Sequence, residues 1–165
     1  MVTKRPEWWP RQAATCGASL PAIARLAGLV LVVAVVVLAV SGTAATAAGR
    51  FPGSSGSQVV PRLGSFYPAV YWHVRAVAAF GIVFGVLAAW AWTRRRAYPW
   101  LLRACAGLLA ILAVQMTIGE VQYRTYGDVP WWLVLLHVAT AAILVGWTVG
   151  LAARIWRPVA ARSAD

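Results

Sequence analysis

Four long apolar stretches, separated by short polar segments, limit what this chain can fold into. They cover residues 20–40, 66–92, 101–119 and 131–155. Each comes close to or exceeds the roughly 20 residues that an α-helix needs to cross a bilayer. A helix suits lipid because it satisfies its own backbone hydrogen bonds. The pattern predicts an all-α fold, an integral membrane four-helix bundle without a second domain.

The composition agrees with a membrane protein. The chain is 61% hydrophobic and only 12% charged, whereas a soluble domain carries roughly a quarter charged residues. Ten tryptophans suit the interfacial belts of a membrane protein. The net charge of +11 also suits a nucleic-acid partner. However, the basic residues cluster between apolar runs, so we expect a lipid bilayer as the partner and no nucleic acid.

The first apolar stretch has an alternative interpretation as a signal peptide, because Ala-rich residues after Ser41 resemble a cleavage region. About twenty polar or mixed residues precede it, and its apolar run is long for the core of a signal peptide. We therefore expect a retained anchor.

Basic residues predict the orientation. Eleven of them fall on one side of the predicted bundle: Lys4, Arg5, Arg11, Arg25, Arg94, Arg95, Arg96, Arg103, Arg154, Arg157 and Arg162. The opposite side has Arg50, Arg62 and Arg124. The positive-inside rule then places both termini in the cytoplasm.

The resulting organisation is a cytoplasmic segment (1–19), a transmembrane domain (20–158) and a cytoplasmic tail (159–165). Residues 41–65 and 120–130 are expected outside. The first of these is rich in Gly, Ser and Thr and contains Pro52 and Pro61, which predicts an irregular loop. A high Arg to Lys ratio and abundant Ala are typical of a high-GC bacterium. We therefore expect a multi-pass protein of the bacterial plasma membrane.

The chain has only two histidines, His73 and His137, and each lies about two turns into its own apolar stretch. They follow Pro68 and Pro130, which suit the first turns of helices. At about 1.5 Å per residue, both lie roughly 7–11 Å along their helices, near the outer face. Ionisable residues inside a membrane suggest function. The pair predicts the two axial ligands of one haem iron, since the porphyrin supplies the other four nitrogens.

The helix faces leave two interpretations open. His73, Val77, Gly81 and Gly85 recur every four residues, which leaves room for a flat macrocycle or for a close neighbouring helix. Thr140, Ala141 and Leu144 share the face of His137. Gln115 shares a face with Gly119, and a hydrogen bond across the bundle is favoured for Gln115 over direct contact with haem.

Other metal sites fit less well. Zinc requires four ligands, often including Cys or carboxylate. Cys16 and Cys105 both fall on the predicted cytoplasmic side, away from the histidines, and a disulfide between them is not expected there. No Asp or Glu lies inside a predicted span. Two alternatives remain besides haem: interhelical hydrogen bonding by the histidines, or another metal.

Arg75 is the one charge well inside a predicted span. It has three expected arrangements: extension of the side chain to the surface, pairing with Glu120, or contact with a haem propionate. Because it follows His73 by two residues, it points to another face, which favours the first two. The nearby aromatic residues suit an interfacial belt; they are Tyr71, Trp72, Trp131 and Trp132.

A family resemblance follows from these residues. The stretch 115–138, QMTIGEVQYRTYGDVPWWLVLLHV, resembles the third-to-fourth-helix signature of the haem A synthase family through Gln115, Gly119, Pro130 and His137. Residues 41–73, with SGTAATAAG and PRLG, resemble the second half of actinobacterial members. The resemblance covers about 40–158.

The resemblance implies one four-helix half of an eight-helix enzyme that oxidises haem O to haem A for cytochrome oxidase assembly. In such enzymes one half holds the reacting haem, with a carboxylate near its histidine, and the other holds haem b. Here position 70 is Val, no acidic residue precedes His73 in its helix, and the extracytoplasmic cysteine pair is absent. Where many members have Arg after this histidine, the chain has Val74. The closest likeness is thus to the cofactor-holding C-terminal half.

Three functions remain at this stage. The first is a haem A synthase-like protein with haem b bound by His73 and His137, acting as a homodimer, with a separate catalytic half, or as part of a longer enzyme. The expected site also includes Gln115 and Arg75, and haem O and haem A would be substrate and product. The others are a small bis-histidine electron-transfer cytochrome and a non-haem structural or assembly membrane protein.

Overall fold

The computed structural model describes residues 20–51 and 63–157, and these residues form four helices. They are α1 (Ala22–Ala48), α2 (Phe66–Thr93), α3 (Pro99–Arg124) and α4 (Trp131–Trp156). No strand occurs in the described ranges. All four helices are long and apolar enough to cross a membrane. The prediction of an all-α chain with four potential membrane-spanning helices is confirmed.

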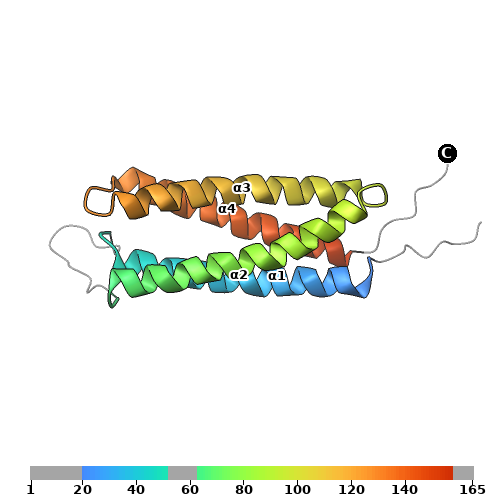
Figure 1. The fold of residues 1–165 in the computed structure, drawn as a ribbon, viewed down its shortest axis with the longest axis horizontal. Coiled ribbons are helices and arrows are strands. Elements are labelled where there is room, and N and C mark those ends of the chain that lie inside the picture. The colour runs from blue at the N-terminus through green and yellow to red at the C-terminus, as the bar shows by residue number, and fades with distance from the viewer. Residues whose placement is uncertain (1–19, 52–62, 158–165) are drawn as a thin grey trace, which may run out of the picture.

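The helices form two antiparallel hairpins, α1–α2 and α3–α4, which lie side by side (Figure 1). Helix α1 also packs along α4 and so joins the hairpins, whereas α2 and α3 make the fewest contacts of any adjacent pair. We call the end at which α2 ends and α3 begins the arginine end, because Arg94, Arg95 and Arg96 lie there. The opposite end, at which α2 and α4 begin, is the histidine end.

Prolines mark several of the helix starts. Pro99 is the first residue of α3, Pro130 immediately precedes α4, and Pro68 is in the first turn of α2. A proline costs nothing at these positions, because the first-turn N–H groups have no partner inside the helix.

Helix α1 is longer than the sequence predicts. Residues 41–48, expected to begin an irregular outer loop, continue the helix to Ala48. The hydroxyls of Ser41, Thr43 and Thr46 donate to backbone carbonyls three or four positions earlier, at 2.6–3.0 Å. Alanines between them favour helix. The hydroxyls are thus satisfied within the helix rather than ending it.

Helix α3 is also longer than expected. It begins at Pro99 and runs to Arg124, so residues 120–124, predicted as part of an outer loop, are helical. Within this last turn, Glu120 accepts a hydrogen bond from Arg124 at 2.6 Å. The connection to α4 is therefore short, which holds the start of α4 close to the end of α3.

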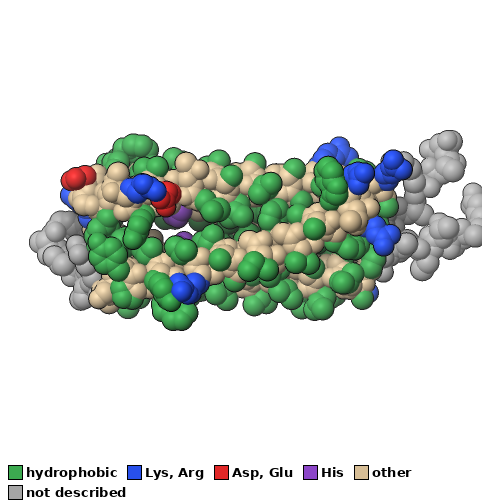
Figure 2. Space-filling model, in the orientation of Figure 1, with side chains coloured by type: hydrophobic (Ala, Val, Ile, Leu, Met, Phe, Trp, Pro, Cys, Tyr) green, Lys and Arg blue, Asp and Glu red, His purple; other side chains and the backbone are tan. Residues whose placement is uncertain are grey.

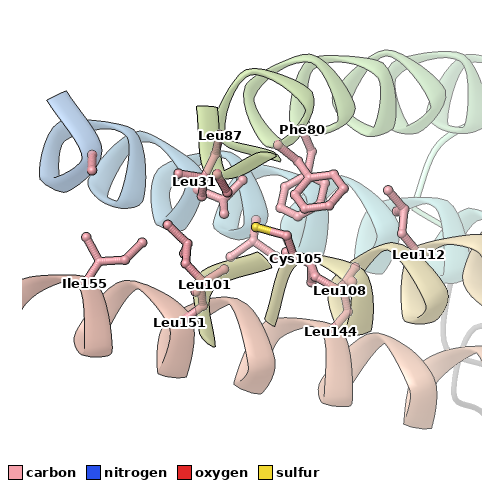
Figure 3. Close-up of a cluster of buried hydrophobic side chains, with 14 of the residues drawn as sticks. Leu31, Phe80, Leu87, Leu101, Cys105, Leu108, Leu112, Leu144, Leu151 and Ile155 are labelled. Atoms are coloured by element: carbon pink, nitrogen blue, oxygen red, sulfur yellow. The ribbon is translucent and has the colours of Figure 1, made fainter. Parts of the chain in front are cut away.

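The main core fills the middle of the bundle and its arginine end. All four helices contribute side chains that are less than 2% exposed, including Leu31, Leu87, Leu101, Leu108 and Ile155 (Figure 3). Cys105 lies within this cluster. Cys16 is outside the described residues. At the histidine end only a small second cluster is buried, namely Ile118, Val129 and Leu133.

The outer faces of the helices are apolar rather than polar. Large side chains such as Ile82 and Val86 on α2 are 69% and 64% exposed. Figure 2 shows hydrophobic side chains along the length of the bundle and basic side chains near both of its ends. Such a surface suits contact with lipid, because a soluble helix would carry polar residues on its exposed face.

Candidate functional site

His73 and His137 start from the same end of the molecule. His73 is the eighth residue of α2 and His137 the seventh of α4. At 1.5 Å per residue, each lies about 9–11 Å from the start of its helix. The chain's histidine side chains lie at a hollow between the two helix pairs (Figure 2). The pair thus comes from two hairpins and lies at similar depth, as the sequence predicts.

His73 is held by the last two turns of α1. The Oγ atom of Ser41 lies 3.1 Å from its Nδ1 atom. Its Cε1 atom would be only 3.1 Å from a Cβ atom at Gly42. The ring therefore rests closely on a glycine, where an added Cβ atom would crowd it, and the serine hydroxyl lies within hydrogen-bond distance of one of its nitrogens.

His137 has a similar place in the other hairpin. Its Cε1 atom would be 3.3 Å from a Cβ atom at Gly119 of α3. Its Nδ1 atom is buried and has no hydrogen-bond partner among the described residues. The ring is therefore set by packing against a glycine, but without the polar contact that Ser41 gives to His73.

The two hairpins share one local design. In each, a histidine from the second helix packs on a glycine from the first, Gly42 for His73 and Gly119 for His137. Neither glycine was among the predicted site residues: Gly119 was noted only for the face it shares with Gln115 and for the family resemblance, and Ser41 and Gly42 were assigned to a loop. The signal available was a glycine near the histidine end of each first helix.

Gln115 and Thr140 join α3 to α4 beside the site. Gln115 is 8% exposed, and its Oε1 atom accepts a hydrogen bond from the Thr140 hydroxyl. The expected hydrogen bond across the bundle is confirmed. A second bond between the same helices, from Gln122 Nε2 to the Leu133 carbonyl at 2.8 Å, lies nearer the histidine end. Together they fix the hairpin that carries Gly119 and His137.

Arg75 lies away from the histidines. Its guanidinium carbon is 3.3 Å from the centre of the Tyr71 ring, one turn earlier on α2, and the side chain is exposed. Of the two favoured arrangements, outward extension is the one found, and the alternative pairing with Glu120 is not formed, because Glu120 pairs with Arg124 in its own helix. An outward-pointing arginine over an aromatic ring suits the edge of a membrane. Its predicted role in cofactor binding stays a prediction.

The glycine stripe on α2 is open. A Cβ atom at Gly81 or at Gly85 would meet nothing within 4 Å. No helix of the described chain therefore packs closely on these glycines, and the expected small-residue packing does not occur there within one copy of the chain.

The described residues include no group of three or more His, Cys, Asp or Glu side chains suited to a metal ion. Cys105 is in the core on α3. A zinc site of the usual type is therefore not assembled in the described ranges. The two imidazoles of His73 and His137 remain, and this donor set suits a cofactor that brings most of its own ligands.

Comparisons with known proteins give no identification. No family model matches the chain, and neither curated proteins nor solved structures include a significant match. The resemblance to haem A synthases therefore stays a prediction from the sequence.

Proposed function

We propose that this chain is an integral membrane protein that binds one haem b through His73 and His137. The observation that carries the proposal is the placement of the two imidazoles. They come from separate hairpins, lie at similar depth and border one hollow, and each packs on a glycine (Figure 2). If both histidines served only to hold helices together, each would be expected to hydrogen-bond across a packed interface, whereas the buried Nδ1 atom of His137 has no partner among the described residues.

The residues around the hollow suit a flat apolar group. Gly42 and Gly119 let the imidazoles sit close to the backbone of α1 and α3. When bound, haem supplies an iron centre that takes up and releases one electron. The protein holds the group, limits access of water and tunes the iron through the histidines.

The reaction we propose is participation in the oxidation of haem O to haem A for cytochrome oxidase assembly. Support comes from the run Gln115, Gly119, Pro130 and His137, which resembles the haem A synthase signature. In the structure these residues belong to one hairpin, and Gly119 and His137 are in contact. We propose the cofactor-holding role, as a homodimer or with a separate catalytic half.

A second candidate is a bis-histidine cytochrome that only transfers electrons. It is favoured by the positions of the acidic groups. The two acidic residues in the described ranges are Glu120, which pairs with Arg124, and Asp128, which lies in the α3–α4 connection. Neither belongs to α2, where the resemblance would require a catalytic carboxylate.

The proposed setting is the bacterial plasma membrane, with the arginine end in the cytoplasm. Seven arginines of the described ranges lie near that end: Arg25, Arg94, Arg95, Arg96, Arg103, Arg154 and Arg157. Single cysteines at positions 95 and 127, in a chain lacking Cys16 and Cys105, would test this. A membrane-impermeant thiol reagent added to intact cells should label position 127 and leave position 95 unlabelled. The reverse pattern would contradict the orientation.

The enzymatic step needs a separate test. Bacterial cells that make haem O but not haem A would express the chain alone, and then together with a catalytic half from a haem A synthase. Haem A formed only when His73 and His137 are intact supports participation in the synthase reaction. Haem-loaded protein without haem A in either arrangement would leave the electron-transfer cytochrome. A colourless but folded protein would leave the structural alternative.

A further inference from the structure

We infer that Ser41 is a positioning residue that fixes the tautomer of His73, with the proton on Nδ1 and a free lone pair on Nε2. The observation is a three-atom chain: His73 Nδ1, Ser41 Oγ and the Leu38 carbonyl oxygen. The Nδ1–Oγ distance is 3.1 Å, and the Oγ–carbonyl distance is 2.9 Å. The tautomer does not depend on haem; only its consequence for iron rests on the proposed function.

The number of hydrogens available in this chain of atoms determines the tautomer. A serine hydroxyl has one hydrogen to donate, and a carbonyl oxygen only accepts. Ser41 donates its hydrogen to the Leu38 carbonyl, so its oxygen accepts from the atom on its other side. That atom is Nδ1 of His73, which must therefore carry the proton. A neutral imidazole has a single N–H, so Nε2 is the bare nitrogen that can bind a metal.

His137 lacks such a partner. Its Nδ1 is buried and makes no hydrogen bond within the described residues, and no hydroxyl on α3 replaces Ser41. Position 118, which precedes Gly119 as Ser41 precedes Gly42, is Ile. A hydrogen bond to the outer nitrogen orients a histidine ligand and increases its basicity. As ligands of a bound haem, the two histidines would therefore be unequal: His73 would be held in place by Ser41, and His137 would be the more easily displaced.

The inequality has a measurable consequence for bound haem. Removal of His137 should leave haem on His73 with an open position that binds carbon monoxide when reduced. Removal of His73 should lower haem occupancy at least tenfold, because the unsupported ligand remains alone. Ser41→Ala should reduce this difference and raise the midpoint potential, because a less basic ligand favours ferric iron less.

The test of the tautomer uses the full chain without haem, labelled with ¹⁵N-histidine in detergent micelles. Because the chain has only two histidines, a His137→Phe variant assigns both sets of signals. We expect His73 to show a protonated Nδ1 and an unprotonated Nε2. Ser41→Ala should convert it to a mixture of tautomers, and Ser41→Thr, which keeps the hydroxyl, should preserve the native pattern.

Thr43→Val is the matched control. Thr43 also donates a hydrogen bond back along α1, at 2.6 Å to the Ala39 carbonyl, but it is exposed. The Thr43→Val substitution should leave the His73 signals unchanged. A proton on Nε2 of His73 in the native chain, or no change in Ser41→Ala, would overturn the inference. A native chain that has the expected tautomer but never takes up haem would instead overturn the proposed function.

Discussion

The two ends of the bundle differ in how closely their side chains pack. Toward the arginine end, side chains from all four helices fill the interior, with Leu31, Leu101 and Ile155 fully buried. Toward the histidine end, the buried apolar cluster is small, namely Ile118, Val129 and Leu133, and Figure 2 shows a hollow there. Both ends use helices of similar length and apolarity. The difference teaches that a closely packed end is enough to hold the four helices together while the other end keeps open space.

Crowding the histidine ring should have the largest effect on haem occupancy. In Gly42→Leu, the new side chain needs the space now taken by the His73 ring, whose Cε1 atom is 3.1 Å from the Cβ position. We expect haem occupancy to fall at least tenfold while helical content by circular dichroism is retained. The matched control is Gly150→Leu on α4, where a Cβ atom meets nothing within 4 Å. Haem occupancy equal to that of the control would contradict the proposed site.

Removing a side chain from the packed end should lower the stability of the bundle and leave haem binding unchanged. Leu101→Ala leaves a cavity where the leucine is 0% exposed. We expect the free energy of unfolding to fall by about 2–3 kcal/mol, because packing is lost although the unfolded helices stay in an apolar medium. Unfolding in mixed micelles measures this change. The haem spectrum should not change; a shifted spectrum would mean that the two ends are not independent.

The close contact between Gly107 on α3 and Trp147 on α4 offers a second test of the packed part of the bundle. A Cβ atom at Gly107 would lie 2.5 Å from Cζ2 of Trp147, whose indole N–H donates to the Ala104 carbonyl at 3.0 Å. Gly107→Ala should therefore lower the free energy of unfolding by about 1–2 kcal/mol and change the tryptophan fluorescence. Adding Trp147→Phe, which shortens the ring system, should recover part of that loss. If Gly107→Ala lowers the free energy of unfolding equally in the native chain and in Trp147→Phe, the Trp147 ring does not occupy the space beside Gly107.

The smallest effect is expected for the bond between Gln115 and Thr140. A double-mutant cycle with Gln115→Leu and Thr140→Val should give a coupling energy of about 0.6 kcal/mol, as for other hydrogen bonds between membrane helices. The haem spectrum of Gln115→Leu should be close to that of the native chain, since Gln115 is engaged with Thr140. A large spectral change would instead assign Gln115 to the cofactor, as the sequence allowed.

The sequence predicted the helices better than their ends. Four apolar stretches were enough to find α1–α4, and the prolines placed the starts of α2 and α4. Residues 41–48 were misassigned because Ser, Thr and Gly are common in loops, whereas here the hydroxyls bond back along the helix. Such bonds depend on the helix already being present, so composition alone does not reveal them.

The assignment of residues 41–48 to a loop also hid the contacts that Ser41 and Gly42 make with His73. His73 and His137 were identified from their depth in the apolar stretches, and Gln115 from its position on α3. Ser41 and Gly42 contact His73 only because α1 continues past position 40. The Arg75–Glu120 pair failed for a related reason: α3 continues to Arg124, which gives Glu120 a partner within its own helix.

The central claim is most directly tested by the reduced-minus-oxidised absorption spectrum of the purified chain, measured beside His73→Ala and His137→Ala. The account predicts a low-spin haem b spectrum in the native chain, weak or absent in His73→Ala and converted to a five-coordinate form in His137→Ala. A native chain that is folded and supplied with haem but remains colourless would contradict it, as would native-like spectra in both variants.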